Sequence, residues 1–260
     1  MVKLFVYKDI YTPIYVMKNF LVSGFKRYYA ETPTANKCIR YLNEKYPYIM
    51  PRIDHIAYRQ IGNVKPLQKL LFHSNYRLMD KIDLPTENPD FPKTAFWYKH
   101  PTFPRVFLSS VKIDNLPKDL QDRMNNNDKN LDLYNEINKY DQYLAWTYFW
   151  KDDINHIAID LSTHPEEFSK IIEEMEQELE LQMNIPKSGD KFSISSDGHL
   201  IQCSTTSDYI NRLPKSYIEF VHREILPINK DKAFPSSIDR KDGFDAINAN
   251  NIFQSTTTNI

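Results

Sequence analysis

Two histidines of this chain stand in nearly the same local sequence. The first lies in Asp54–Arg59, which reads DHIAYR, and the second lies in Asn155–Asp160, which reads NHIAID. Side chains of a β-strand alternate between two faces, so His55 and His156 each share a face with the alanine two positions on. Two imidazoles presented in the same way by two strands are candidate ligands for one metal ion.

A third apolar run, Tyr217–Arg223, supplies a carboxylate, because its alternation places Glu219 and Arg223 on one face. Two imidazoles and one carboxylate form a facial triad that leaves about half of an octahedral shell open. Non-haem Fe(II) oxygenases use this ligand set, since both a substrate and O2 need open positions. Zn(II) or Mn(II) fits the same atoms. Structural roles for the three side chains are the competing interpretation.

Two arginines follow the candidate ligands at the same spacing. Arg59 shares a strand face with His55, as Arg223 does with Glu219. A guanidinium can hold a carboxylate through two parallel hydrogen bonds. One arginine is therefore a candidate clamp for a substrate carboxylate, and the other a candidate brace for a ligand. Ordinary salt bridges are the alternative for both.

Composition excludes several classes of function. The 260 residues are 41% hydrophobic and 26% charged with a net charge of -1, as in ordinary globular proteins. Basic residues are dispersed, which argues against a nucleic-acid partner, and no apolar run approaches the roughly 20 residues that span a bilayer. Only two cysteines are present, and the N-terminus lacks the pattern of a secretory signal. We therefore expect a cytoplasmic protein with no membrane partner.

Hydrophobic periodicity predicts the elements that position these side chains. It indicates a helix over 34–46 and another that begins at a capping box, Thr163 with Glu166, and ends near Leu181. A helix and three strands follow each histidine strand. The order predicts an α+β fold in which two βαβββ modules form a half-open barrel with peripheral helices. The expected single catalytic domain comprises an N-terminal helical arm (1–50), a first module (51–114), connecting helices (115–142), a second module (143–226) and a C-terminal covering segment (227–260).

Further motifs accompany the two histidine strands in a fixed order. They are Arg52–Arg59, Phe103–Ser109, Ala145-Trp146, Ile154–His156, Ser193–Thr205, Ser216–Arg223, Asp242–Phe244, Asn248-Ala249 and Ile252–Thr256. With these motifs the chain resembles the 2-oxoadipate dioxygenase/decarboxylase family, also called 2-hydroxyglutarate synthases and formerly a domain of unknown function. The resemblance implies a fold similar to that of the vicinal-oxygen-chelate proteins.

The resemblance also implies a site and a reaction. It assigns the metal ligands to His55, His156 and Glu219 and the substrate-binding arginine to Arg59. The implied cofactor is Fe(II), and the implied partners are O2 and a small 2-oxo acid that binds iron through its carboxylate and keto oxygen. Oxidative decarboxylation and hydroxylation would convert 2-oxoadipate into 2-hydroxyglutarate and CO2. No separate 2-oxoglutarate would be consumed.

Departures from the family pattern leave the exact 2-oxo acid open. Ser110 and His222 stand where relatives usually carry acidic residues, and Tyr209 is larger than its usual counterpart. Candidates for lining the pocket or bracing a ligand are Gln202, Ser204 and Arg223. Two other functions fit the same scaffold: a Zn- or Mn-dependent lyase, isomerase or hydrolase, and a non-catalytic binding module that retains the fold.

Overall fold

The computed structural model describes residues 6–84, 86, 88–164, 166–186, 189–232, 235–246 and 248, with side chains from Met17 on. The first five residues of the expected N-terminal arm lie outside the described residues. So does the expected covering segment from residue 249 on, including the motif Ile252–Thr256. Contacts divide the chain into two units. Unit 1 comprises Met1–Ala30, Ala57–Ile82 and Thr86–Ile154, and unit 2 comprises Glu31–Ile56, Asp83–Pro85 and Asn155–Ile260.

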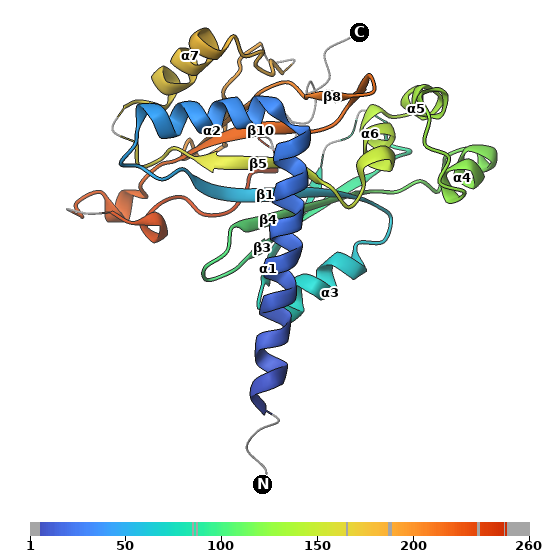
Figure 1. Ribbon diagram of the computed structural model, residues 1–260, viewed down its shortest axis with the longest axis horizontal. Coiled ribbons are helices and arrows are strands. Elements are labelled where there is room, and N and C mark those ends of the chain that lie inside the picture. Colours follow the sequence, from blue (N-terminus) through green and yellow to red (C-terminus); the bar gives the residue numbers. More distant parts are fainter. Residues whose placement is uncertain are drawn as a thin grey trace. The chain divides into compact units, whose positions relative to one another are not determined.

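Figure 1 shows the helices and strands of the described residues. The helices are α1 (Val6–Glu31), α2 (Pro33–Lys45), α3 (Lys65–His73), α4 (Lys118–Asn125), α5 (Leu131–Asn138), α6 (Gln142–Trp150) and α7 (Phe168–Leu179), with short 3-10 helices at Pro227–Asn229 and Ser237–Asp239. The strands are β1 (Arg52–Ile61), β2 (Arg77–Leu84), β3 (Lys93–Lys99), β4 (Arg105–Val111), β5 (Ile154–Asp160), β6 (Ser193–Ile194), β7 (Leu200–Ser204), β8 (Tyr209–Ile210), β9 (Leu213–Pro214) and β10 (Tyr217–Arg223). No described helix is both long and apolar enough to cross a membrane.

Unit 1 contains strands in the order β2-β3-β4-β1, the helix α1 as far as Ala30, and the helices α3 to α6. β3 and β4 form an antiparallel hairpin in which Ala95 lies opposite Ser109. The aromatic run before the second histidine forms α6, whose residues Tyr143 to Phe149 are all buried. A helix that is apolar on all sides belongs in a core, and α6 packs against α5 (Figure 1).

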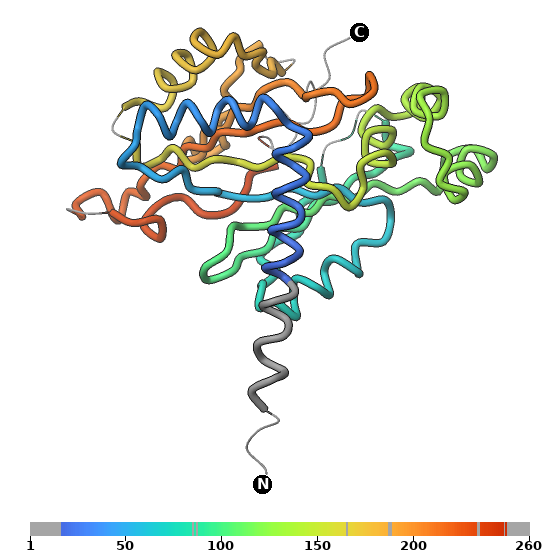
Figure 2. The backbone as a smooth tube through the Cα atoms, in the orientation of Figure 1, coloured from blue at the N-terminus to red at the C-terminus, as the bar shows by residue number. Residues whose placement is uncertain are grey.

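Unit 2 contains the strand order β1-β5-β10-β7-β6. β5 and β10 are parallel, so the chain must cross over between them, whereas β10 and β7 are antiparallel. α2 lies along β10 although the two are far apart in sequence (Figure 2, blue and orange). Its buried face includes Ala35, Cys38 and Leu42, whose spacing of three and four residues matches one side of a helix. The helix predicted over 34–46 is therefore confirmed.

The predicted start of α7 is wrong. The helix begins at Phe168, and its N-cap is Glu167, which makes no side-chain capping bond. The predicted capping box at Thr163 and Glu166 therefore does not form. The predicted apolar stripe is present, since Phe168, Ile171, Ile172 and Met175 are buried. Burial of this stripe decides where the helix lies, because packing stabilises a short helix more than its cap does.

The order of elements follows the predicted pattern twice. The first series is β1-α3-β2-β3-β4, and the second is β5-α7-β6-β7-β10, with the small β8–β9 hairpin inserted before its last strand. Each series opens with a histidine strand. The chain is therefore α+β, as predicted, and β1 passes from unit 2 into unit 1.

Candidate metal centre

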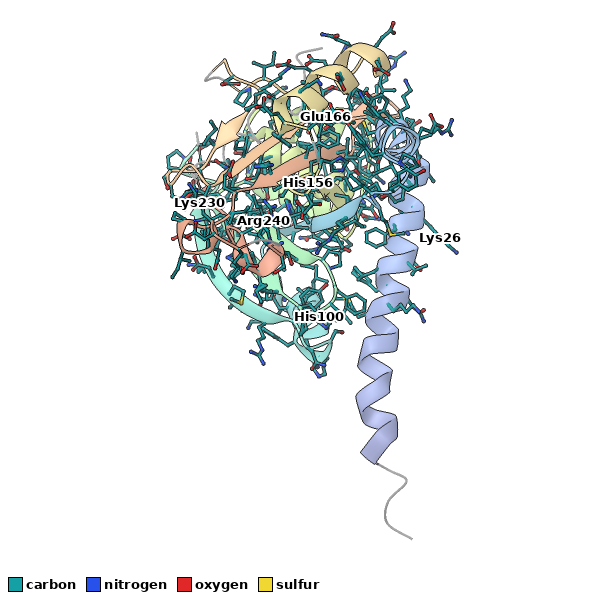
Figure 3. All side chains as sticks on the ribbon, turned by 90° about the vertical axis from the view of Figure 1, so that its left-hand side faces the viewer. Lys26, His100, His156, Glu166, Lys230 and Arg240 are labelled. Carbon is teal, nitrogen blue, oxygen red and sulfur yellow. The ribbon has the colours of Figure 1, made fainter. Side chains whose placement is uncertain are left out.

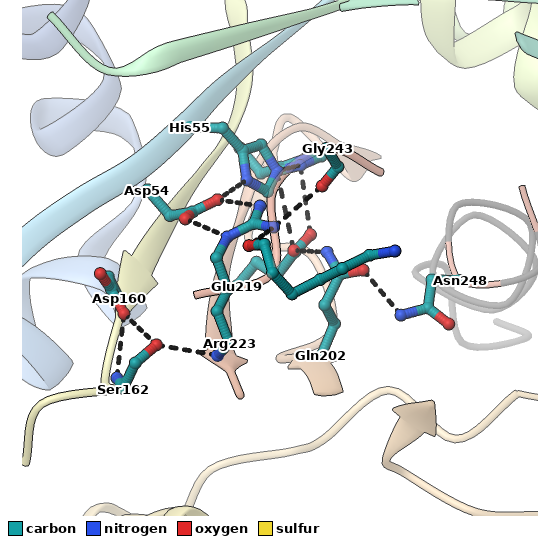
Figure 4. A network of polar contacts seen from close by, with 11 residues as sticks. Asp54, His55, Asp160, Ser162, Gln202, Glu219, Arg223, Gly243 and Asn248 are labelled. Carbon is teal, nitrogen blue, oxygen red and sulfur yellow. Dashed lines mark hydrogen bonds and ion pairs between the residues drawn. The ribbon is translucent and has the colours of Figure 1, made fainter. Parts of the chain in front are cut away.

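Three strands of unit 2 bring the predicted ligands together. His55 on β1, His156 on β5 and Glu219 on β10 are each at most 3% exposed, and their ligand atoms all lie within 4.8 Å of one another. The two Nε2 atoms are 3.2 Å apart, and Glu219 oxygens lie 3.2 Å from Nε2 of His156 and 3.6 Å from Nε2 of His55. Figure 3 shows His156 in the interior, and Figure 4 shows His55 above the Glu219 carboxylate.

Strand register explains why Glu219 fits at this point. It lies opposite Ala158 on β5 and opposite Ser204 on β7, so small side chains flank it on both neighbouring strands. His156 lies opposite Tyr217, and the two rings stack with their centroids 4.6 Å apart. Small neighbours leave room for the carboxylate, and the stacked tyrosine holds the plane of the imidazole.

A polar side chain fixes the orientation of each imidazole. Nδ1 of His55 lies 2.9 Å from Oδ2 of Asp54, and Nδ1 of His156 lies 2.9 Å from Oδ1 of Asn155. Both partners are oxygens that accept hydrogen bonds, so each Nδ1 carries a hydrogen, and Nε2 is the ring nitrogen that remains for a metal ion. Each Nε2 then presents a lone pair to the centre of the cluster. Metal-binding histidines are usually held in this way.

This donor set fits a metal ion. Two lone pairs and a carboxylate face one another in a buried space, where they repel unless a cation lies between them. Nitrogens about 2.1 Å from one ion would be about 3.0 Å apart at a right angle and about 3.4 Å apart in a tetrahedron. The observed 3.2 Å between the Nε2 atoms lies in this range. The buried His-His-Glu cluster can therefore bind a metal.

Arg223 braces the cluster through Asp54, not through Glu219. Its Nε and Nη2 donate to the two Asp54 oxygens at 2.7 and 2.8 Å (Figure 4). Burial alone would lower the pKa of Arg223, but the Asp54 carboxylate outweighs it and raises that pKa above its ordinary value. Asp54 is thus neutralised by a permanent positive charge while it orients His55. The sequence suggested that one arginine braces a ligand carboxylate, whereas the carboxylate that Arg223 binds belongs to Asp54, which orients a candidate ligand.

Gln202 holds the carboxylate ligand. Its Nε2 donates to Oε1 of Glu219 at 2.5 Å, and its Oε1 accepts from Nδ2 of Asn248 at 2.9 Å. The candidate Ser204 is buried on the adjacent strand, where its hydroxyl accepts from Nδ2 of Asn184 at 3.3 Å. Gln202 therefore contacts a candidate ligand directly, whereas Ser204 flanks one.

Arg59 lies in unit 1, on the part of β1 beyond the metal cluster. Only 2% of its surface is exposed, and its guanidinium carbon lies 3.7 Å from the ring centroid of Trp146 and 4.7 Å from that of Tyr143. Both aromatic residues come from α6, and the Tyr143 hydroxyl donates to Ser109 at 2.5 Å. Stacking on an aromatic face fixes the plane of a guanidinium, so its N–H groups are pre-oriented.

Glu219 makes metal binding sensitive to pH. Burial raises its pKa to about 7, although the His55 ring and the Gln202 hydrogen bond lower it. The folded protein therefore holds this proton more tightly than the unfolded chain, and in the metal-free protein the stability it contributes is lost as pH rises from about 4.5 toward 7. A metal ion must displace that proton.

We expect the zinc dissociation constant to rise about fivefold from pH 7 to 6 and to approach a tenfold rise per pH unit below pH 6, where Glu219 releases about one proton per ion bound. Above pH 7.5 Glu219 should no longer contribute to the pH dependence of the zinc dissociation constant. Calorimetric titration with Zn(II) in buffers of different ionisation enthalpy measures both quantities. A dissociation constant that stays flat from pH 5.5 to 8 would contradict the assignment of Glu219 as a ligand.

Sequence reasoning missed the residues that orient the ligands. Strand alternation places Asp54 and Asn155 on the face opposite to the histidines they precede, so neither was a candidate. An available signal was the polar oxygen-bearing residue directly before each histidine, because metal-binding imidazoles usually donate to such a group. Asn248 appeared only as part of a motif, since nothing local links it to Gln202.

Comparisons with known proteins identify similar chains and similar folds. No family model matches the chain. A chloroplastic 2-oxoadipate dioxygenase/decarboxylase of Arabidopsis thaliana is 26% identical where the two align, and the alignment covers 78% of this chain and 67% of the relative. The 2-oxoadipate dioxygenase/decarboxylase, chloroplastic/amyloplastic, of Oryza sativa subsp. japonica is 27% identical where the two align, and the alignment covers 89% of this chain and 76% of that relative. The predicted resemblance to these proteins is confirmed, and their names support an enzyme.

Solved structures support the fold. The hydroxyglutarate synthase of Oryza sativa, solved in complex with 2-oxoadipate, matches with a TM-score of 0.77 at 23% identity, over 94% of this chain and 93% of that one. A putative glyoxalase superfamily protein of Ralstonia eutropha matches with a TM-score of 0.66 at 14% identity, over 87% and 84%. The predicted α+β, vicinal-oxygen-chelate-like fold is therefore confirmed.

Proposed function

We propose that this protein is an Fe(II)-dependent dioxygenase and decarboxylase that converts 2-oxoadipate, or a similar 2-oxo dicarboxylic acid, with O2 into 2-hydroxyglutarate and CO2. The observation that carries the proposal is the buried convergence of His55, His156 and Glu219 with both imidazole Nδ1 atoms already bonded. The names of the curated relatives favour this reaction over others that a facial triad supports.

In this proposal His55, His156 and Glu219 hold the iron. Bound Fe(II) would supply the open coordination positions and the redox chemistry that O2 activation needs. The reaction balances without another reductant: one oxygen atom enters the new carboxylate, and the other becomes the hydroxyl of the product. This explains why no second 2-oxo acid is required.

Other side chains of the site bind the substrate or orient the metal ligands. Arg59 is the proposed partner of a substrate carboxylate, because its stacked guanidinium presents a planar pair of donors. Asp54 and Asn155 accept from the two Nδ1 atoms, so the Nε2 atoms are the ones that would face the metal. Because Arg223 balances Asp54, iron and Glu219 would leave one net positive charge, which favours an anionic substrate.

An oxygen-electrode assay tests the proposal. The protein should be stripped with a chelator, reloaded with Fe(II), Mn(II) or Zn(II), and supplied with 2-oxo acids of three to seven carbons. We expect turnover only with Fe(II), with equal molar amounts of O2 consumed and CO2 released, and fastest with a 2-oxo dicarboxylic acid. Turnover that continues without O2 would instead indicate a Zn or Mn lyase. Absence of stoichiometric metal binding would indicate a non-catalytic module.

A further inference from the structure

One guanidinium connects the metal cluster to the C-terminal part of the chain. While Nε and Nη2 of Arg223 bind Asp54, its Nη1 donates to the main-chain carbonyl oxygens of Lys241 at 3.1 Å and Gly243 at 2.9 Å. Asp54 in turn accepts from His55. An unbroken series of hydrogen bonds thus runs from a candidate ligand to two backbone positions far along the sequence (Figure 4).

A second connection reaches the carboxylate ligand. Asn248 is fully buried, and its Nδ2 donates to Oε1 of Gln202 at 2.9 Å. This bond decides which way the Gln202 amide is turned, so that its Nε2 faces Glu219. Asn248 therefore controls the orientation of a group that holds a ligand, without touching the ligand itself.

An aromatic ring lies between these two connections. The Phe244 ring meets the His55 ring edge-on with centroids 4.8 Å apart, and it lies 5.7 Å from the guanidinium carbon of Arg223. An apolar ring in this position keeps water away from the ion pair and from the imidazole. Electrostatic interactions among the enclosed groups are then stronger than they would be in water.

We infer that residues 241–246 and 248, here called the C-terminal strap, close over the metal cluster and position its ligands, so that strap closure and metal binding strengthen each other. Arg223, Gln202 and Asn248 are the positioning residues. Such coupling is reciprocal, so any factor by which closure tightens metal binding is the factor by which metal stabilises closure. The inference rests on the proposed metal site and adds a conformational role for the strap.

The first test compares two asparagines of the same C-terminal region. Asn248→Ala releases the Gln202 amide, and we expect Zn(II) to bind the full chain about 10-fold more weakly, the lower end of the 10- to 100-fold effect of losing a direct partner of a metal ligand, because Asn248 acts through Gln202. Asn229→Ala removes an amide that donates to the backbone of Asp239 at 3.2 Å and is not bonded to Gln202 or to any of the three candidate ligands. This control should bind Zn(II) as the wild type does, as measured by competition with a chromophoric chelator.

The second test measures closure of the C-terminal strap by hydrogen exchange. The amide of Lys241 donates to the carbonyl of Glu224 at 2.9 Å, so hydrogen exchange at residues 241–246 reports closure. In the wild type, Zn(II) should slow this exchange by about the same 10- to 100-fold factor. Arg223→Lys keeps a charge for Asp54 but loses the fork that also holds the strap. The Arg223→Lys variant should still bind Zn(II), but Zn(II) should no longer slow hydrogen exchange at residues 241–246.

A Co(II)-loaded sample adds a spectroscopic measurement. If Asn248 sets the geometry of Glu219, the visible absorption bands of Co(II) should shift in Asn248→Ala and not in Asn229→Ala, whereas a loss of stability alone would leave the bands in place. Unchanged zinc affinity and exchange in both Asn248→Ala and Arg223→Lys would overturn the inference while leaving the metal site intact. A wild-type chain that binds no zinc would overturn the inference together with the proposed function.

Discussion

His156→Ala should leave a folded protein that no longer binds metal. The substitution removes one of three ligands, and we expect the affinity for Fe(II) or Zn(II) to fall by more than about 100-fold, beyond the effect of losing a mere partner of a ligand. Turnover should fall with it. The ring is buried and stacks on Tyr217, so some stability is lost as well, about 1–3 kcal/mol.

The matched control is His222→Ala on β10. This histidine packs near Phe168 and bonds to Glu224 at 3.1 Å, away from the ligand cluster. Elemental analysis should find one metal ion per chain in the control and none in His156→Ala. Thermal unfolding provides a second measurement, because zinc at 1,000 times its dissociation constant stabilises a binding protein by about 4.1 kcal/mol. Stoichiometric metal retained by His156→Ala would show that the ligand set is wrong.

Strand alternation is enough to select the three candidate ligands from the sequence. Each stands in an apolar strand with a small or apolar residue two positions on, and this local pattern survives folding because consecutive residues around each ligand are buried, so that packing fixes the register. The pattern also predicts the order of strands and helices, since helices and strands have different hydrophobic periods. What joins the ligands is the lateral order of β1, β5 and β10, which the repeated motif suggested only indirectly.

Long-range polar partners are not predictable in this way. Arg223 and Asp54 are separated by 169 residues, and either could have paired with several charged residues on grounds of charge alone. The orientation of Asp54 toward the histidine beside it contradicts simple alternation. The capping box before α7 failed for a related reason: a local pattern of a few residues competes with packing of the whole apolar stripe, and packing is stronger.

Arg59 differs from the ligands, because its proposed role concerns substrate alone. Arg59→Ala should leave one metal ion per chain and raise KM for a 2-oxo dicarboxylic acid. A hydrogen bond to a charged group contributes about 1.5–3 kcal/mol, which corresponds to about a 10- to 150-fold loss of substrate affinity. Arg59→Lys keeps the charge but loses the planar fork and its stacking on Trp146. Its KM should therefore lie between those of the wild type and Arg59→Ala.

Lys93→Met provides the control for this arginine. Lys93 is another cation of unit 1, with its ammonium 5.4 Å from the Tyr143 ring centroid and 2.6 Å from Asp141, the residue that caps α6. Its removal should lower stability, because Asp141 loses its partner, and leave KM unchanged. Steady-state kinetics with metal analysis on the same samples separates the two roles. If Arg59→Ala lost the metal while His156→Ala kept it, the assignment of ligand and substrate residues would be reversed.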